Sequence, residues 1–171
     1  MNIQGITSIH YIDYDSVVVN GRSDKAFVPY FEYHIDTARF KIDQYYLGTP
    51  HWNTTVYDLG KFVVWNYYSG TLTYPQLPDL RAAFESNIQA RLGSWLKGPI
   101  EFVGTEYIGG KFCNVFRDST GLQEWVWIEH RLPIQRRRES VNRGIHQITV
   151  EQKRQIEING QFQNSLFEPP K

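Results

Sequence analysis

Apolar and polar positions alternate with a period of two along most of the chain, and this alternation predicts β-strands. The clearest example is the stretch 30–46, where aromatic and aliphatic residues alternate with polar ones up to Asp36. The alternation resumes at Arg39 in the opposite phase. A change of phase within one extended segment predicts a bulge or bend near 37–38.

Similar segments recur on both sides of this stretch and are separated by short turns such as Asn20–Gly21, Leu59–Gly60 and Gly109–Gly110. Short connections of this kind join antiparallel strands. The further expected strands cover residues 5–20, 54–58, 61–68, 71–74, 101–107, 111–117, 124–129, 134–139 and 145–158.

One segment, 78–97, has a different period. Its apolar residues recur mainly at spacings of four, which indicates an amphipathic helix. Pro78 and Asp79 suit a first helical turn, and Gly98–Pro99 suits a stop. The apolar stripe consists of Leu80, Phe84, Ile88, Leu92, Trp95 and Leu96.

About eight or more antiparallel strands interrupted by one helix make an α+β chain. A sheet with one apolar face must be covered, and the helix is the element available to cover it. The chain has no linker, repeat or low-complexity segment, so residues 1–171 are expected to form a single domain.

The composition of the chain narrows the classes of function that it can have. The 18 basic and 18 acidic residues cancel, so the chain lacks the charge expected of a nucleic-acid-binding protein. No stretch approaches the ~20 apolar residues of a membrane span. The first residues do not resemble a signal peptide. Two locations stay open: the cytoplasm, or the cell envelope if an export signal has been removed.

Candidate chemistry is sparse. The five histidines lack the spacing of a metal motif, and no nucleophile elbow, phosphate loop or dinucleotide fingerprint is present. His34 and Asp36 share a strand face and could form a metal or acid–base pair, but a solvated outer face is the favoured interpretation. Arg136–Arg138 alternates between two faces, which favours a solvated strand. Cys113 lies in an alternating strand and is expected to be a small buried residue.

The order of several short motifs resembles the LolA/LolB-type lipoprotein carrier superfamily, which includes RseB-type regulators and LppX-like lipoproteins. The resemblance spans roughly residues 30–170. The matching fragments are Arg39-Phe40-Lys41-Ile42, Val56-Tyr57-Asp58-Leu59-Gly60-Lys61, Trp65-Asn66-Tyr67, Pro78, Gly110-Lys111-Phe112-Cys113, Trp127-Ile128-Glu129, Leu132-Pro133 with Arg136, and Phe167-Glu168-Pro169-Pro170.

This resemblance implies a curved antiparallel half-barrel, an incomplete barrel whose concave face is covered by the helix at about 78–97. It also implies a hydrophobic cavity for acyl chains of lipids or lipoproteins, a periplasmic or envelope location, no cofactor and no catalytic residues. The chain departs from the family in two ways: it lacks an amphipathic helix before the first strand, and Asp36 stands near the place of a family arginine.

The expected function is therefore the binding or carrying of a hydrophobic ligand. Three alternatives remain: a closed core without a cavity, a sensor of the RseB type that contacts a membrane-associated protein, and an enzyme on an unrelated barrel. The expected lining residues are Phe31, Tyr33, Phe40, Ile42, Val64, Trp65, Tyr67, Phe84, Ile88, Leu92 and Trp95.

Overall fold

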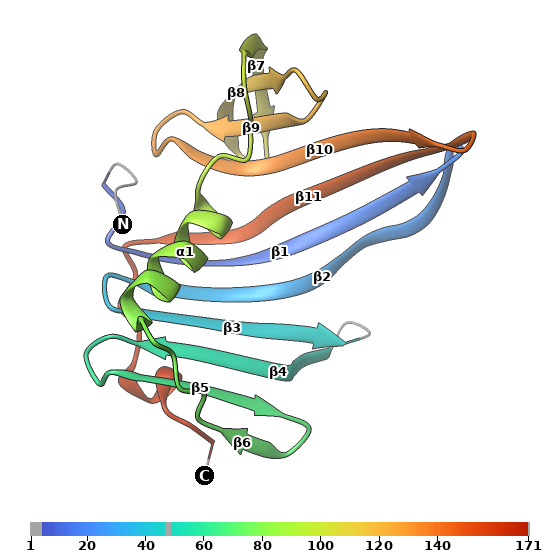
Figure 1. Ribbon diagram of the computed structural model, residues 1–171. Coiled ribbons are helices and arrows are strands. Elements are labelled where there is room, and N and C mark those ends of the chain that lie inside the picture. Colours follow the sequence, from blue (N-terminus) through green and yellow to red (C-terminus); the bar gives the residue numbers. More distant parts are fainter. Residues whose placement is uncertain (1–4, 47–48, 171) are drawn as a thin grey trace.

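We describe residues 5–46 and 49–170 of the computed structural model, with their side chains except those of 24–28, 46 and 49–52. In this part of the chain eleven strands form one sheet, in the order β6-β5-β4-β3-β2-β1-β11-β10-β9-β8-β7 (Figure 1). The strands are β1 (Ser8–Val19), β2 (Arg22–Asp36), β3 (Arg39–Tyr46), β4 (Thr49–Asp58), β5 (Val63–Tyr68), β6 (Thr71–Thr73), β7 (Ile100–Ile108), β8 (Lys111–Asp118), β9 (Gln123–Trp127), β10 (Leu132–Asn142) and β11 (Ile145–Ile158).

Two meanders of neighbouring hairpins, β1–β6 and β7–β11, make up this sheet. They join where β1 pairs with β11 in antiparallel register, from Val19 opposite Gln147 to Ile9 opposite Ile158. Helix α1 (Leu80–Leu92) connects the two outermost strands, β6 and β7. The first and last strands of the chain therefore form the middle of the sheet.

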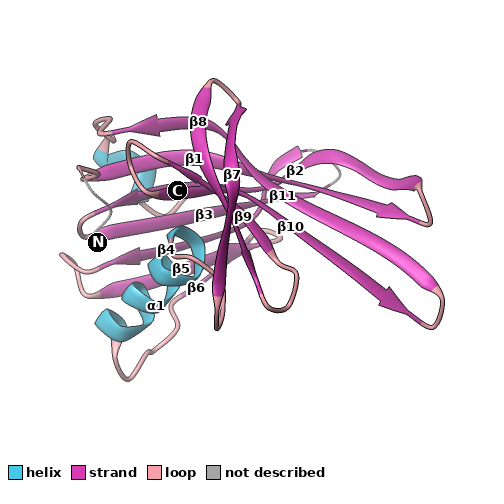
Figure 2. Ribbon diagram, turned by 90° about the horizontal axis from the view of Figure 1, so that it is seen from above, coloured by secondary structure: helices cyan, strands magenta, loops and turns pink. Residues whose placement is uncertain are grey.

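The sheet is open, because its order ends at β6 on one side and at β7 on the other. Strands β7–β9 are turned steeply relative to β1–β6 (Figure 2). All strand pairs are antiparallel. The predicted α+β class is confirmed, and the open, strongly twisted sheet fits a half-barrel.

Helix α1 lies across one face of the sheet (Figure 1). Asp79 caps its first turn by accepting a hydrogen bond from the Ala82 amide at 2.9 Å. Its buried residues are Phe84, Ile88 and Leu92. They share one core with residues from the sheet: Ile9, Tyr11, Tyr33, Ile35, Phe40, Cys113, Val115, Trp125, Leu132 and Ile134.

The prediction that this helix continues to Lys97 was wrong. It ends at Leu92, and the Gly93 amide donates to the Gln89 carbonyl as the cap. The Trp95 and Lys97 amides instead donate to the side chains of Glu124 and Asp118. These distant carboxylates provide acceptors that a further helical turn would otherwise have supplied.

The predicted bend at Thr37–Ala38 is a hairpin turn between two separate strands, β2 and β3. Asp36 stabilises it by accepting hydrogen bonds from the backbone amides of Ala38 at 2.9 Å and Arg39 at 2.7 Å. The change of phase in the sequence therefore marks a reversal of the chain.

The C-terminal segment covers the other face of the sheet. Its short 3₁₀ helix η1 (Asn164–Phe167) lies on the side opposite α1 (Figure 2). Phe167 is buried with Val56 and Trp65, and the Trp65 indole donates to the Phe167 carbonyl at 3.2 Å. The sheet thus carries apolar clusters on both faces.

Candidate functional site: a cleft beside helix α1

A cleft of about 730 Å³ runs beside α1, between the helix and the turns at one end of the strands. The turns after β2, β4 and β9 contribute to it. The lining residues are Thr37, Leu59, Arg81, Phe84, Glu85, Ile88, Gln89, Leu92, Gly93, Ser94, Val126, Arg131 and Pro133.

The wall and the rim of this cleft differ in character. Phe84, Ile88 and Leu92 form an apolar wall and are 3%, 8% and 2% exposed. The rim carries charged side chains, among them Arg81 and Glu85. Arg81 Nη1 lies 3.9 Å from Glu85 Oε1, one helical turn further along α1. Six of the thirteen lining residues are polar or charged, so the cleft joins an apolar wall to an extensive polar rim: Thr37, Arg81, Glu85, Gln89, Ser94 and Arg131.

A buried ion pair fixes the end of α1 to the sheet. Glu124 on β9 is fully buried and accepts hydrogen bonds from the Ser94 hydroxyl at 2.6 Å, the Trp95 amide at 2.7 Å and Arg136 Nε at 2.9 Å. Arg136 on β10 also donates to the Gly93 carbonyl at 2.7 Å. We call this group of five residues the helix clamp.

The clamp corrects the prediction that Arg136 belongs to a solvated strand face. Its side chain is only 7% exposed, and its guanidinium lies 4.0 Å from the centre of the Trp95 ring. Arg138, two residues further along β10, is exposed as predicted. Alternation identified the shared face of the two arginines, but the depth of burial depends on where α1 lies.

The sheet face under α1 also carries buried polar groups. Tyr11 and Tyr33 stack at 4.8 Å between ring centres, and their buried hydroxyls have no hydrogen-bond partner among the described residues. Burial raises the pKa of both phenols. Lys153 is buried, and its Nζ atom lies 3.8 Å from Asp13 Oδ1. Burial lowers the pKa of its ammonium group. Polar atoms therefore interrupt the apolar inner face.

The structure distributes the eleven predicted lining residues over several places. Phe84, Ile88 and Leu92 line the cleft. Val64 borders a smaller pocket of about 90 Å³ near the start of α1. Phe31, Tyr33, Phe40 and Ile42 pack in the core beneath the helix.

The remaining three predicted lining residues lie elsewhere. Trp65 and Tyr67 are on the face covered by the C-terminal segment, where they border a pocket of about 320 Å³. Trp95 lies beyond the end of α1, and its indole donates to the Ala90 carbonyl at 2.8 Å. The structure does not bring these three side chains to the cleft.

Sequence reasoning missed cleft residues at or beside the turns, among them Leu59 after β4, Val126 on β9 and Pro133 on β10. Leu59 and Pro133 stand in the turn motifs that resemble the carrier superfamily. For Leu59 this position was the only signal, because a turn carries no periodicity that would reveal an inward-facing side chain.

The suggested pair of His34 and Asp36 does not form. Asp36 is occupied by the β2–β3 turn and by Arg39, whose Nη2 atom lies 2.6 Å from its carboxylate. Cys113 is buried as predicted, and burial raises the pKa of its thiol to about 11. A thiol of this kind is a poor nucleophile at neutral pH.

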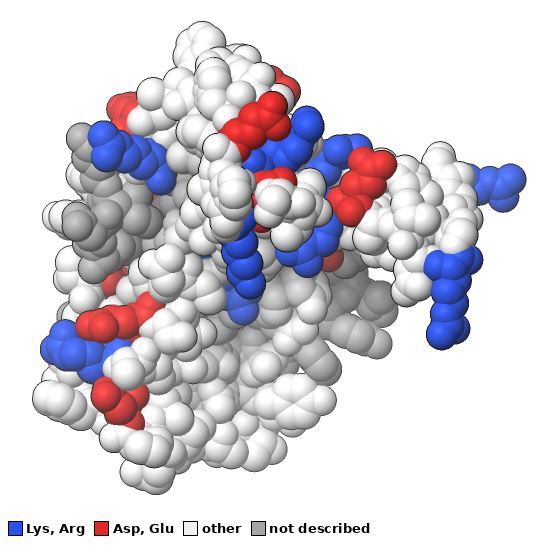
Figure 3. Space-filling model, turned by 45° about the horizontal axis from the view of Figure 1, so that its top comes forward, with Lys and Arg blue, Asp and Glu red and all other residues white. Residues whose placement is uncertain are grey.

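Charged side chains of both signs are intermixed on the face shown in Figure 3, with broad uncharged areas between them. This matches the formal net charge of +0. Among the described residues, no helix combines the length and the apolar character needed to cross a bilayer.

No protein-family model matches the chain, and no curated protein is similar enough in sequence to count as a relative. Among solved structures, LppX of Mycobacterium tuberculosis is similar (TM-score 0.38, 11% identity), and the match covers 88% of this chain and 86% of LppX. An outer-membrane lipoprotein-sorting protein domain of Vibrio parahaemolyticus is also similar (TM-score 0.36, 8% identity), and that match covers 96% of this chain and 91% of the domain's chain.

A third similar structure is MucB, with a TM-score of 0.48 and 14% identity, which covers 94% of this chain and 57% of the MucB chain. LppX, which the sequence resemblance also named, is among these similar structures. With identities of 8–14% and TM-scores below 0.5, nothing about the function of this chain follows from them.

Proposed function

We propose that this protein binds a hydrophobic ligand, a lipid or lipoprotein acyl chain, in the cleft beside α1. The main observation behind this proposal is the cleft, which has a volume of about 730 Å³ along an apolar wall of Phe84, Ile88 and Leu92. Its size falls within the roughly 300–1,000 Å³ that is usual for ligand pockets. In this proposal α1 covers the concave face of the half-barrel, and the protein binds its ligand outside the cytoplasm.

An acyl chain needs no directed polar contact to bind such a wall. Each methylene removed from water contributes about 0.8 kcal/mol, which corresponds to about a fourfold change in Kd. The rim offers Arg81 and Arg131 to an anionic head group. No catalytic group is required, so the proposed activity is binding without chemistry.

The helix clamp gives the cleft a defined edge. Because Glu124 and Arg136 hold the C-terminal end of α1, a ligand that widens the cleft would move the other end of the helix. At the other end, the Asp79 side chain accepts a hydrogen bond from the Ala82 amide, a local contact that does not reach the sheet. The clamp thus supports a cover that is anchored at one end.

The experiment has two steps. Lipids are extracted from the purified protein and identified by mass spectrometry, and delipidated protein is then titrated with a fluorescent long-chain fatty acid. We expect saturable binding with a Kd that falls about fourfold per added methylene until the chain outgrows the cleft.

A matched pair of variants in the turn after β4 locates the site. Leu59→Glu places a charge in the cleft wall, whereas Phe62→Glu changes a side chain that is 86% exposed outside it. We expect Leu59→Glu to weaken binding at least tenfold and Phe62→Glu to leave it unchanged. Equal binding by both variants, or no binding of any chain length, would refute the proposal.

A second function, a sensor that contacts a membrane-associated protein, is favoured by strand β7. It ends the sheet, and its side chains Phe102 and Tyr107 are 57% and 64% exposed. The adjoining Phe112 on β8 is 64% exposed. Such an edge can accept a strand of another protein, and a pull-down from a periplasmic extract that depends on Tyr107 and Phe112 would support this alternative.

A further inference from the structure

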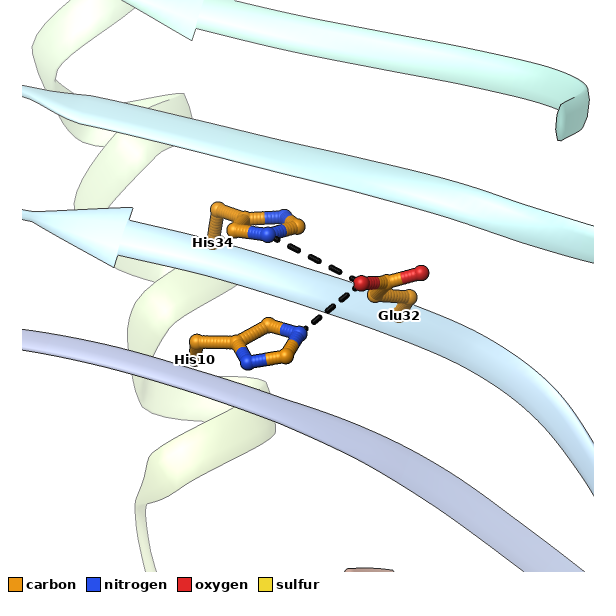
Figure 4. Close-up of side chains that lie close together, drawn as sticks. All are labelled: His10, Glu32 and His34. Carbon is orange, nitrogen blue, oxygen red and sulfur yellow. Dashed lines mark hydrogen bonds and ion pairs between the residues drawn. The ribbon is translucent and has the colours of Figure 1, made fainter. Parts of the chain in front are cut away.

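Three side chains meet on the face of the sheet opposite the cleft. His10 on β1 stands directly across from His34 on β2, and Glu32 lies two residues before His34 on the same face. Figure 4 shows both imidazoles directed at one carboxylate oxygen of Glu32. We call these residues the His–Glu–His cluster.

The donor atoms have spacings close to those of a metal site. Glu32 Oε1 lies 2.8 Å from His10 Nε2 and 3.7 Å from His34 Nε2, and one donor atom from each residue lies within 4.8 Å of the others. In a tetrahedral zinc site with bonds of about 2.0–2.2 Å, neighbouring donors are about 3.3–3.6 Å apart. The two distances from Glu32 lie on either side of this range, so small side-chain shifts would bring all three donors to one ion.

The surroundings orient these donors. The Tyr45 hydroxyl donates to Glu32 Oε2 at 2.8 Å, which leaves Oε1 turned toward the histidines. Glu157 Oε2 lies 3.8 Å from His10 Nδ1, the nitrogen on the far side of the ring. A carboxylate behind a ligating histidine is a common outer-shell partner of metal sites.

The cluster is shielded from solvent. The side chains of His10, His34 and Glu32 are 14%, 13% and 18% exposed. Phe162 of the C-terminal segment meets the His34 ring edge-on at 5.5 Å between centres. His34 Nδ1 is buried and has no hydrogen-bond partner among the described residues, so no hydrogen bond fixes its tautomer against metal binding at Nε2.

We propose that His10, Glu32 and His34 form a binding site for a divalent transition-metal ion of the zinc type, with a fourth position open to water or another ligand. Two imidazoles and one carboxylate suit zinc better than magnesium or calcium, which prefer oxygen ligands. The ion would link β1 to β2 beneath the C-terminal segment. This site is separate from the cleft beside α1 and does not depend on the function proposed for it.

The test uses the full chain after treatment with EDTA and removal of the chelator. Isothermal titration with ZnCl₂ is expected to give one site with a Kd in the micromolar range or tighter. Titration with CoCl₂ is expected to give the intense visible absorption of four-coordinate cobalt. A thermal scan with excess zinc should show a higher Tm, because the ion binds the folded state.

Three variants assign the site. His34→Ala and Glu32→Gln are each expected to weaken zinc binding at least 100-fold. The matched control is His146→Ala, because His146 pairs with Glu139 at 2.5 Å on an exposed surface. Within the described part of the chain, that pair has no third histidine, cysteine or carboxylate placed to complete a metal site.

Circular dichroism of each variant checks that it is folded. Fatty-acid binding by the same variants should be unchanged, since the cluster lies on the other face of the sheet. Failure of zinc and cobalt to bind, or binding that survives both His34→Ala and Glu32→Gln, would overturn the proposal. Weaker binding in His146→Ala than in His34→Ala would do the same.

Discussion

Replacing Glu124 by alanine tests the helix clamp, which ties the end of α1 to the sheet. The carboxylate is fully buried and accepts hydrogen bonds from Ser94, Trp95 and Arg136 at 2.6, 2.7 and 2.9 Å. The substitution removes all three acceptor contacts at once. It also leaves the Arg136 guanidinium buried without its main counter-charge.

The expected loss of stability follows from these contacts. Removal of one member of a buried ion pair costs about 3–5 kcal/mol, because the remaining charge stays buried. Among the described residues, Arg136 would keep the Gly93 carbonyl at 2.7 Å, the Trp95 ring and the Glu151 carboxylate at 4.0 Å. We therefore expect Glu124→Ala to lower the free energy of unfolding by about 4 kcal/mol, which for a chain of this size lowers the Tm by about 8–16 °C.

Urea unfolding followed by tryptophan fluorescence and circular dichroism measures this loss. The control is Glu129→Ala, because the Glu129 side chain is 71% exposed just after the same strand. This control is expected to change stability by less than about 0.5 kcal/mol.

A second comparison separates the lost pair from the lost packing. The double variant Glu124→Leu with Arg136→Met removes both charges, so it should be more stable than Glu124→Ala alone. A loss below about 1 kcal/mol in Glu124→Ala would show that the Glu124 contacts do not hold the helix. A double variant less stable than Glu124→Ala would show that the unpaired Arg136 charge is not the main cost.

Three further substitutions or reactions test other parts of the fold. Gly93→Ala should destabilise the protein by about 1–3 kcal/mol, because a Cβ atom would lie 2.5 Å from the Gln89 carbonyl oxygen; Gly160→Ala, with open space around it, should be nearly neutral in the same urea titration. Phe167→Ala should cost about 3–5 kcal/mol, since Phe167 is 2% exposed against Trp65; a loss under about 1 kcal/mol would mean that the C-terminal segment is not part of the folded unit. The pKa of Cys113 is raised to about 11. At pH 8, iodoacetamide should therefore alkylate Cys113 at least ~100-fold more slowly in the folded protein than in the urea-unfolded protein, and the rate in the folded protein should keep rising through pH 9 and 10. A rate that levels off near pH 9 would contradict the raised pKa.

Local patterns predicted most of the secondary structure. The strand expected at 145–158 matches β11 at both ends, and the hairpins around Leu59–Gly60 and Gly109–Gly110 are present. These features depend on alternation and on turn residues, which are properties of neighbouring positions. The same reasoning located α1 but extended it five residues too far, to Lys97.

The errors arose where distant residues decide the outcome. Glu124 and Asp118 accept hydrogen bonds from backbone amides after α1, and the sequence near 93–97 does not indicate these partners. Arg136 is buried beneath the segment that follows α1, where the Gly93 carbonyl and the Trp95 ring contact it. The His–Glu–His cluster depends on the register that places His10 opposite His34, which is not visible in either strand alone.

The faces of the lining residues show the same limit. The predicted lining included both Val64 and Trp65, which are neighbours on β5, although alternation sends neighbours to opposite faces. Val64 borders the pocket near the start of α1, and Trp65 packs against the C-terminal segment. Because the C-terminal segment covers the second face, both faces carry large apolar side chains. A pattern that is apolar on both sides gives no basis for choosing the side of the cleft.

The pairing of β1 with β11 constrains how the protein can be made. During synthesis β1–β6 leave the ribosome first, and β1 has no partner on one side until residues up to Ile158 have emerged. Contacts between residues so far apart in sequence form slowly, and an unpaired strand edge invites association with other chains. Nascent chains stalled before β11 should therefore depend on chaperones, and a circular permutant that joins the present ends and opens the segment between α1 and β7 should relieve that dependence.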